Sequence, residues 1–188
     1  MEDTLKSGID DLVLYLTEKY KDWDGVNQLQ GTPERLFKMY QEFCWSPERI
    51  RTELDSQFRL FENGYDQMLV RGPITVWVLC PHHLLPVSLR VTIGYVPSGR
   101  VLGLSKFTRI AQVMGHRPIM QEQYSTELTD ELYKRLDPKG VAVYIAGRHG
   151  CMLSRGILED SQVVTSNIRG VFESQPETRA EFFAICRG

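Results

Sequence analysis

The spacing of hydrophobic side chains divides the chain into a helical N-terminal part and a later part that contains strands. Over residues 3–21 apolar side chains recur every three or four positions, the repeat that gives a helix one apolar face. Two more helices are predicted after Thr32-Pro33 and Ser46-Pro47, because a hydroxyl side chain followed by proline is typical of a helix start, with Thr32 and Ser46 as N-caps. Residues 1–62 are therefore predicted to form an N-terminal helical segment.

From residue 63 onwards the hydrophobic repeat changes to two, which is typical of strands. Between Val87 and Tyr95 every second side chain is apolar, the pattern of a strand with one buried face. Gly72-Pro73 predicts a bend or an edge position, since proline cannot donate to a sheet ladder. The order of elements predicts an α+β domain over residues 63–188, with a mostly antiparallel sheet and helices packed on one face. The other predicted strands are 68–79, a return strand at 101–104, 141–148 and 162–166, and the predicted helices are 105–114, 122–136 and 176–185.

Composition and charge restrict the class of protein and its partners. Of the 188 residues, 42% are hydrophobic and 24% are charged, which argues against disorder. No apolar run approaches the roughly 20 residues of a membrane span, and the acidic N-terminus does not resemble a secretory signal. A net charge of −2 provides no general basic surface for nucleic acid, so an anionic ligand needs a local cluster of cations. With four scattered cysteines, we predict a cytoplasmic protein with no nucleic-acid or membrane partner.

Two short segments contain most of the metal-binding chemistry of the chain. Cys80-Pro81-His82-His83 and His149-Gly150-Cys151 hold three of the four histidines and two of the four cysteines. The cysteine and histidine of a C-x-x-H turn can bind one ion, and residues two apart on a strand share a face. Thiolates together with imidazoles favour zinc. Five candidates exceed the four ligands that zinc usually takes, so spacing alone leaves open which of them bind and whether the site is structural or catalytic.

Further motifs accompany these two segments in a consistent order. They are Thr32-Pro33-x-Arg35-x-x-Lys38-Met39-Tyr40, Cys80-x-His82-His83-Leu84-Leu85-Pro86, Gly103-Leu104-Ser105-Lys106-x-x-Arg109-Ile110, Gln121-Glu122, His149-x-Cys151-Met152-x-x-Arg155-Gly156 and Val164-Thr165-Ser166. With these motifs the sequence resembles the GTP cyclohydrolase I family over about residues 32–186.

The resemblance implies a fold, an assembly and a reaction. The fold is the tunnelling fold, and the assembly is a homodecamer with active sites between subunits. The reaction is hydrolysis of GTP, in which the imidazole ring opens at C8, formate leaves and 7,8-dihydroneopterin triphosphate forms. By the same correspondence Cys80, His83 and Cys151 bind Zn²⁺, whereas His82 and His149 transfer protons. The chemistry suits these side chains, because zinc activates water and histidine titrates near neutral pH.

The resemblance also assigns residues to the guanine base and to the phosphates. Glu122 is the implied guanine anchor, with Gln121 beside it, since a carboxylate can accept from both N1–H and the exocyclic amine. Without the resemblance, Glu122 is better explained as a charge that favours a helix N-terminus. The implied phosphate ligands are one serine and five cations: Ser105, Lys106, Arg109, Arg155, Arg35 and Lys38.

Four positions depart from the family pattern, and two alternative functions stay open. Pro81 and Ala146 stand where glutamate is common, whereas Ile119 and Gln123 replace a glutamine and an arginine beside the guanine anchor. The second pair leaves open the choice between GTP and a deoxy or modified guanine nucleotide. One alternative is a non-catalytic zinc-containing oligomer that binds purine or pterin. The other is a different tunnelling-fold enzyme, such as the deazapurine nitrile reductase, which is disfavoured because the sequence lacks a dinucleotide fingerprint.

Overall fold

The structure, a computed structural model, describes residues 2–187 and divides into two packed units at Cys44. The N-terminal unit contains the helices α1 (Glu2–Lys19) and α2 (Thr32–Phe43) and a short 3-10 helix, η1 (Val26–Leu29). α2 packs against α1, which buries Ile9 and Val13. The predicted N-cap at Thr32 is wrong by one residue, because Gly31, with a left-handed φ of 71°, occupies the cap position. η1 lies in the connection between α1 and α2.

The second unit begins with α3 (Pro47–Asp55) and β1 (Leu60–Glu62). The predicted cap of α3 is confirmed, since the Ser46 hydroxyl accepts a hydrogen bond from the Arg49 amide at 3.2 Å. α3 packs against α4 (Leu104–Gly115), and β1 pairs with β4 (Arg100–Leu102) in a separate two-stranded sheet. Residues 45–62 therefore pack with the second unit, although the sequence pattern groups them with the N-terminal helices. The predicted return strand at 101–104 is wrong in its partner, because β4 pairs with β1 and not with the preceding strand.

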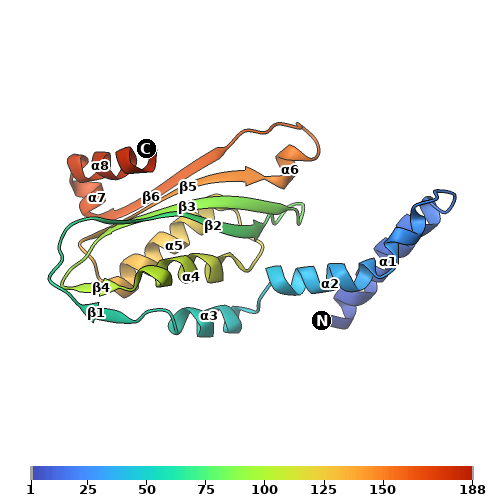
Figure 1. The fold of residues 1–188 in the computed structure, drawn as a ribbon, viewed down its shortest axis with the longest axis horizontal. Helices are drawn as coiled ribbons and strands as arrows, with labels where there is room; N and C mark the ends of the chain where they lie inside the picture. Colours follow the sequence, from blue (N-terminus) through green and yellow to red (C-terminus); the bar gives the residue numbers. More distant parts are fainter. Residues whose placement is uncertain (1, 188) are drawn as a thin grey trace. The chain divides into compact units, whose positions relative to one another are not determined.

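The main sheet has four antiparallel strands in the order β2-β3-β5-β6 (Figure 1). The strands are β2 (Leu69–Leu79), β3 (Pro86–Val96), β5 (Gly140–His149) and β6 (Val163–Gly170). β2 lies at an edge, and its register with β3 shifts between Arg71 and Ile74. Both features confirm the edge position or bend predicted from Gly72-Pro73. The α+β class with a mostly antiparallel sheet is also confirmed.

Helices cover the sheet on both faces, to different extents. α4 and α5 (Gln121–Leu136) lie together on one face, as Figure 1 shows, and form the main core with β2, β3 and β5. The expectation of helices on one face is incomplete, because α7 (Val171–Ser174) and α8 (Pro176–Arg187) cover part of the opposite face. There Phe182 is fully buried against Gly94, where an added Cβ would lie 2.6 Å from the Phe182 ring. None of the described helices is long and apolar enough to cross a membrane.

The packing of α8 provides a test of the second core. We expect Phe182→Ala to lower the free energy of unfolding by about 3–5 kcal/mol, because it removes a buried ring and leaves a cavity against β3. The matched control is Ile185→Ala on the same helix, whose side chain is exposed and should cost about 0.5 kcal/mol or less. Urea unfolding followed by circular dichroism measures both. Equal losses for the two variants would contradict this packing.

Candidate active site

One end of the four-stranded sheet brings the two cysteine- and histidine-containing segments together. Cys80 directly follows β2, and Val87 of β3 pairs with Val78 on one side and with His149 on the other. The chain then turns from β5 into the short helix α6 (Gly150–Leu153), which carries Cys151. The expectation that His149 and Cys151 share the face of a strand is therefore wrong. β5 ends at His149 and α6 begins at Gly150, and both His149 and Cys151 line the same cavity.

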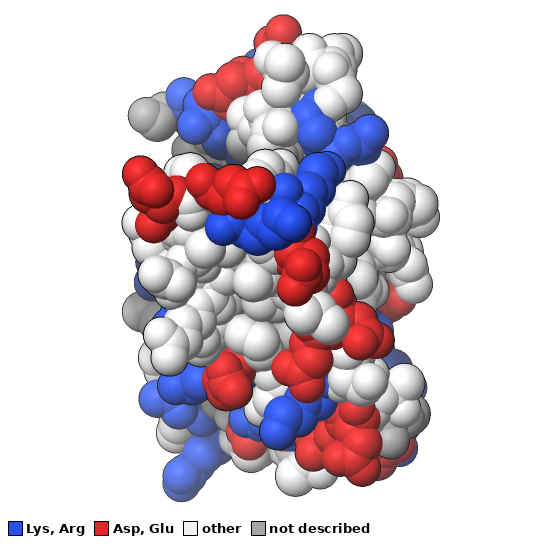
Figure 2. All heavy atoms as spheres, turned by 90° about the vertical axis from the view of Figure 1, so that its right-hand side faces the viewer, with Lys and Arg blue, Asp and Glu red and all other residues white. Residues whose placement is uncertain are grey.

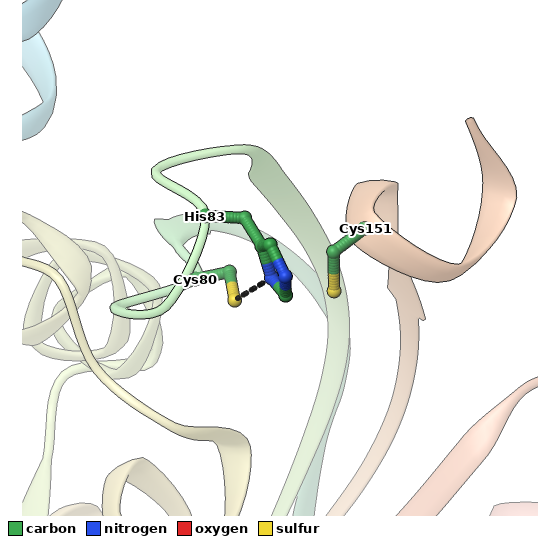
Figure 3. Close-up of side chains that lie close together, drawn as sticks. All are labelled: Cys80, His83 and Cys151. Carbon is green, nitrogen blue, oxygen red and sulfur yellow. Dashed lines mark hydrogen bonds between the residues drawn. The ribbon is translucent and has the colours of Figure 1, made fainter. Parts of the chain in front are cut away.

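Three side chains from these segments form a compact group of possible metal ligands (Figure 3). The ligand atoms of Cys80, His83 and Cys151 all lie within 4.8 Å of one another. The turn that carries the first two is closed by backbone hydrogen bonds, from Leu84 N to Cys80 O at 2.8 Å and from Cys80 N to Leu85 O at 2.9 Å. His83 Nδ1 lies 3.5 Å from Cys80 Sγ. The structure thus selects His83 over His82 for this group.

The donor set of this group fits zinc. Two thiols and one imidazole are soft and intermediate ligands that zinc prefers, and three protein ligands leave one position for water or substrate. Burial and the neighbouring Cys80 thiol raise the pKa of Cys151. A bound divalent cation would instead lower the pKa of both cysteines, because it stabilises their thiolate form. The group is therefore compatible with a catalytic type of metal site.

A cavity of about 190 Å³ adjoins these three possible ligands. It is lined by residues of the C-x-x-H turn, the β5–α6 junction and the start of α5: Cys80, Pro81, His82, His83, Val87, Ile119, Met120, Gln121, Glu122, His149 and Cys151. Two of the four departures from the family pattern, Pro81 and Ile119, are among them. A third, Gln123, instead donates to the Glu127 carboxylate at 2.8 Å. The cavity thus combines both predicted proton-transfer histidines with the predicted guanine anchor.

His149 and Glu122 differ in their surroundings. His149 is half-buried, and burial lowers its pKa, although the Glu122 carboxylate acts in the opposite direction. The neutral imidazole is therefore favoured near neutral pH, as proton transfer requires. Glu122 is exposed at the start of α5 and free to face a ligand in the cavity. Gln121, in contrast, is only 1% exposed.

The predicted phosphate ligands lie in different places. Arg155 lies beside the Cys80–His83–Cys151 group, with its Nη1 atom 2.6 Å from His83 Nε2. Ser105, Lys106 and Arg109 lie on the first turns of α4, which begins after the far end of β3. β3 has 11 residues and spans about 35 Å, so these three residues lie toward the end of the sheet opposite the metal group. Among the described residues that line the cavity, none comes from α4.

Two of the predicted phosphate ligands, Arg35 and Lys106, have local partners. Arg35 and Lys38 lie on α2 of the N-terminal unit, where the Arg35 guanidinium donates to Gln30 O at 2.8 Å. Lys106 Nζ donates to Gln57 Oε1 at 3.1 Å, a partner that no sequence spacing indicates. The face in Figure 2 carries basic and acidic side chains close to one another, with neither sign covering it. This mixture agrees with the net charge of −2.

The fold and this site define an α+β protein with a Cys–His–Cys group of possible metal ligands beside a cavity of about 190 Å³. The model of the family described as GTP cyclohydrolase I matches residues 12–187, and the chain belongs to this family. The resemblance predicted from the motifs is confirmed.

Relatives of known name agree with this assignment. The GTP cyclohydrolase 1 of Aquifex aeolicus (strain VF5) is 40% identical over 163 residues, which cover 85% of each chain. That of Dehalococcoides mccartyi (strain CBDB1) is 35% identical over 188 residues, covering 98% of this chain and 96% of the relative. Among solved structures, the apo archaeosine synthase QueF-Like covers 58% of this chain and 97% of its own, with 18% identity and a TM-score of 0.44.

Proposed function

We propose that this protein is a zinc-dependent GTP cyclohydrolase I. It opens the imidazole ring of GTP at C8 by hydrolysis, releases formate and forms 7,8-dihydroneopterin triphosphate. The observation that carries the proposal is one cavity that contains a Cys80–His83–Cys151 group, two further histidines and an exposed carboxylate, in a chain of this family.

The residues of the cavity divide the chemistry among them. Zinc bound by Cys80, His83 and Cys151 would supply Lewis-acid activation of water, which ring hydrolysis at neutral pH requires. The Glu122 carboxylate accepts from N1–H and the exocyclic amine of guanine and so orients the base. His82 and His149 exchange protons with the ring nitrogens and the sugar oxygen as the bonds break.

The same proposal includes an oligomer in which two copies of the chain complete each site. The cavity on one chain holds Arg155 nearby but lies far from Ser105, Lys106 and Arg109. A second copy of the chain would bring these three residues to the triphosphate, where the first amides of α4 also favour an anion. The resemblance to the family sets the expected number at ten subunits. All four cysteines are free among the described residues, which suits the reducing cytoplasm.

The direct test is incubation of the zinc-loaded protein with GTP. We expect equimolar formate and, after oxidation and dephosphorylation, fluorescent neopterin, with a loss of both on chelation. Light scattering on the same sample should give an oligomer. Zinc-loaded, oligomeric protein that binds GTP but forms neither product would overturn the proposal and favour the non-catalytic binder.

Arg155 provides a more specific prediction. We expect Arg155→Ala to raise the KM for GTP about 10- to 100-fold, because a charge-assisted contact to phosphate is lost. Zinc content must be measured on the same sample, since Arg155 also contacts His83. Arg148→Ala is the matched control, an exposed arginine paired with Asp160 at 3.3 Å. An unchanged KM in Arg155→Ala would remove Arg155 from the triphosphate site.

A further inference from the structure

The side chain of Gln121 lines the cavity but is almost fully buried, and both ends of its amide lie within hydrogen-bond distance of protein groups. Its Nε2 atom lies 2.9 Å from Val163 O, 3.1 Å from Thr165 Oγ1 and 3.3 Å from Ile145 O. Its Oε1 atom lies 2.9 Å from His149 Nε2. At 1% exposure, Gln121 offers little surface to a purine, and both ends of its amide already have protein partners. Gln121 is therefore badly placed for the substrate-binding role that the family motif implies.

These partners determine which end of the Gln121 amide faces His149. The carbonyl oxygens of Val163 and Ile145 can only accept hydrogen bonds, so the atom beside them must be the NH₂ donor. A flipped amide would place an oxygen against two carbonyl oxygens and leave buried acceptors unpaired. Oε1 therefore faces His149, and it can only accept. The nitrogen opposite it, His149 Nε2, must carry the proton.

A neutral imidazole has one protonated nitrogen and one lone pair. With Nε2–H donated to Gln121, the lone pair is on Nδ1. We propose that Gln121 is a positioning residue that holds His149 in the Nε2–H tautomer, so that Nδ1 is the atom that exchanges a proton with the substrate. The proton exchange with the substrate rests on the proposed function, whereas the tautomer of His149 rests only on the hydrogen bonds around Gln121.

The neighbouring strand is shaped around this contact. Gly147 on β5 lies against the amide, and a Cβ added there would be 2.0 Å from Gln121 Oε1 and 3.0 Å from Leu89 Cδ2. Gly147→Ala therefore displaces the Gln121 oxygen without changing Gln121 itself. It is a second, independent way to break the contact with His149.

Solid-state ¹⁵N NMR of the zinc-loaded protein, labelled at histidine nitrogens, tests the tautomer without any turnover. The chain has only four histidines, and His149→Ala identifies the signal of His149. Above the titration range of the imidazole, we expect a protonated Nε2 and an unprotonated Nδ1. A protonated Nδ1 in the wild-type protein would overturn the inference. Because the spectrum does not depend on GTP, it can be read even if the proposed function fails.

Steady-state kinetics tests the consequence for the reaction. We expect Gln121→Met to lower kcat about 10²-fold or more while the KM for GTP changes less than about 3-fold, since a misplaced general acid–base costs that much. Gly147→Ala should act in the same direction if Gln121→Met fails to fold. The matched control is Gln67→Met, an exposed glutamine bound to Asp66 at 2.7 Å and outside the cavity, which should leave kcat within about 2-fold. A raised KM with unchanged kcat in Gln121→Met would show a purine ligand instead and overturn the positioning role.

Discussion

Replacing Cys151 with serine is expected to remove zinc from the purified protein and to lower neopterin formation by about 10²-fold or more. Serine keeps the size of the side chain but provides a hydroxyl that does not ionise near neutral pH, so the group loses one of its three proposed zinc ligands. Metal analysis of the dialysed protein and the neopterin assay measure the two effects. Since Cys151 is only half-buried, the fold should persist.

The control for this change is Cys186→Ser. Cys186 lies on α8, among the residues that pack against the second core, and burial raises the pKa of its thiol to about 11. Cys186 packs with the second core and is not part of the Cys80–His83–Cys151 group. Its replacement should therefore leave zinc content and activity near wild type. Normal zinc in Cys151→Ser, or loss of zinc in Cys186→Ser, would contradict the assigned ligands.

Replacing His149 with alanine is expected to lower the rate of neopterin formation by about 10³-fold, while zinc stays bound. The reason is that His149 is outside the Cys80–His83–Cys151 group and is proposed to transfer protons, which is typically worth about 10²–10⁴ in rate. Stopped assays with the fluorescent product measure the rate, and metal analysis of the same sample confirms zinc.

The matched control is His116→Phe, which changes the one histidine with no proposed role. His116 stacks on Trp45 with ring centroids 3.8 Å apart, and phenylalanine preserves that stacking. We expect activity close to wild type. Near-normal turnover in His149→Ala would show that His82 or bound water carries the proton transfers, and His149 would lose its catalytic assignment.

The sequence predicted secondary structure correctly where the pattern depends on residues close together in the chain. The alternation from Val87 to Tyr95 predicted β3, and Ser46-Pro47 predicted the cap of α3 that the Ser46 hydroxyl provides. Predictions failed where the partner was distant. β4 pairs with β1, and α8 packs Phe182 against Gly94. The sequence did not predict these contacts, because each joins two segments that are distant along the chain and no periodic pattern indicates which distant segments meet.

The sequence by itself determined the chemistry available to this protein: two cysteine- and histidine-containing segments, an adjacent glutamine and glutamate, and the motifs that place the chain in its family. Only the tertiary structure decided how these groups are used. The register of β2, β3 and β5 brings Cys80, His83 and Cys151 within 4.8 Å and turns His149 toward Gln121. Side-chain spacing constrains neighbours within a turn or a strand, whereas strand register and helix packing determine which distant segments meet.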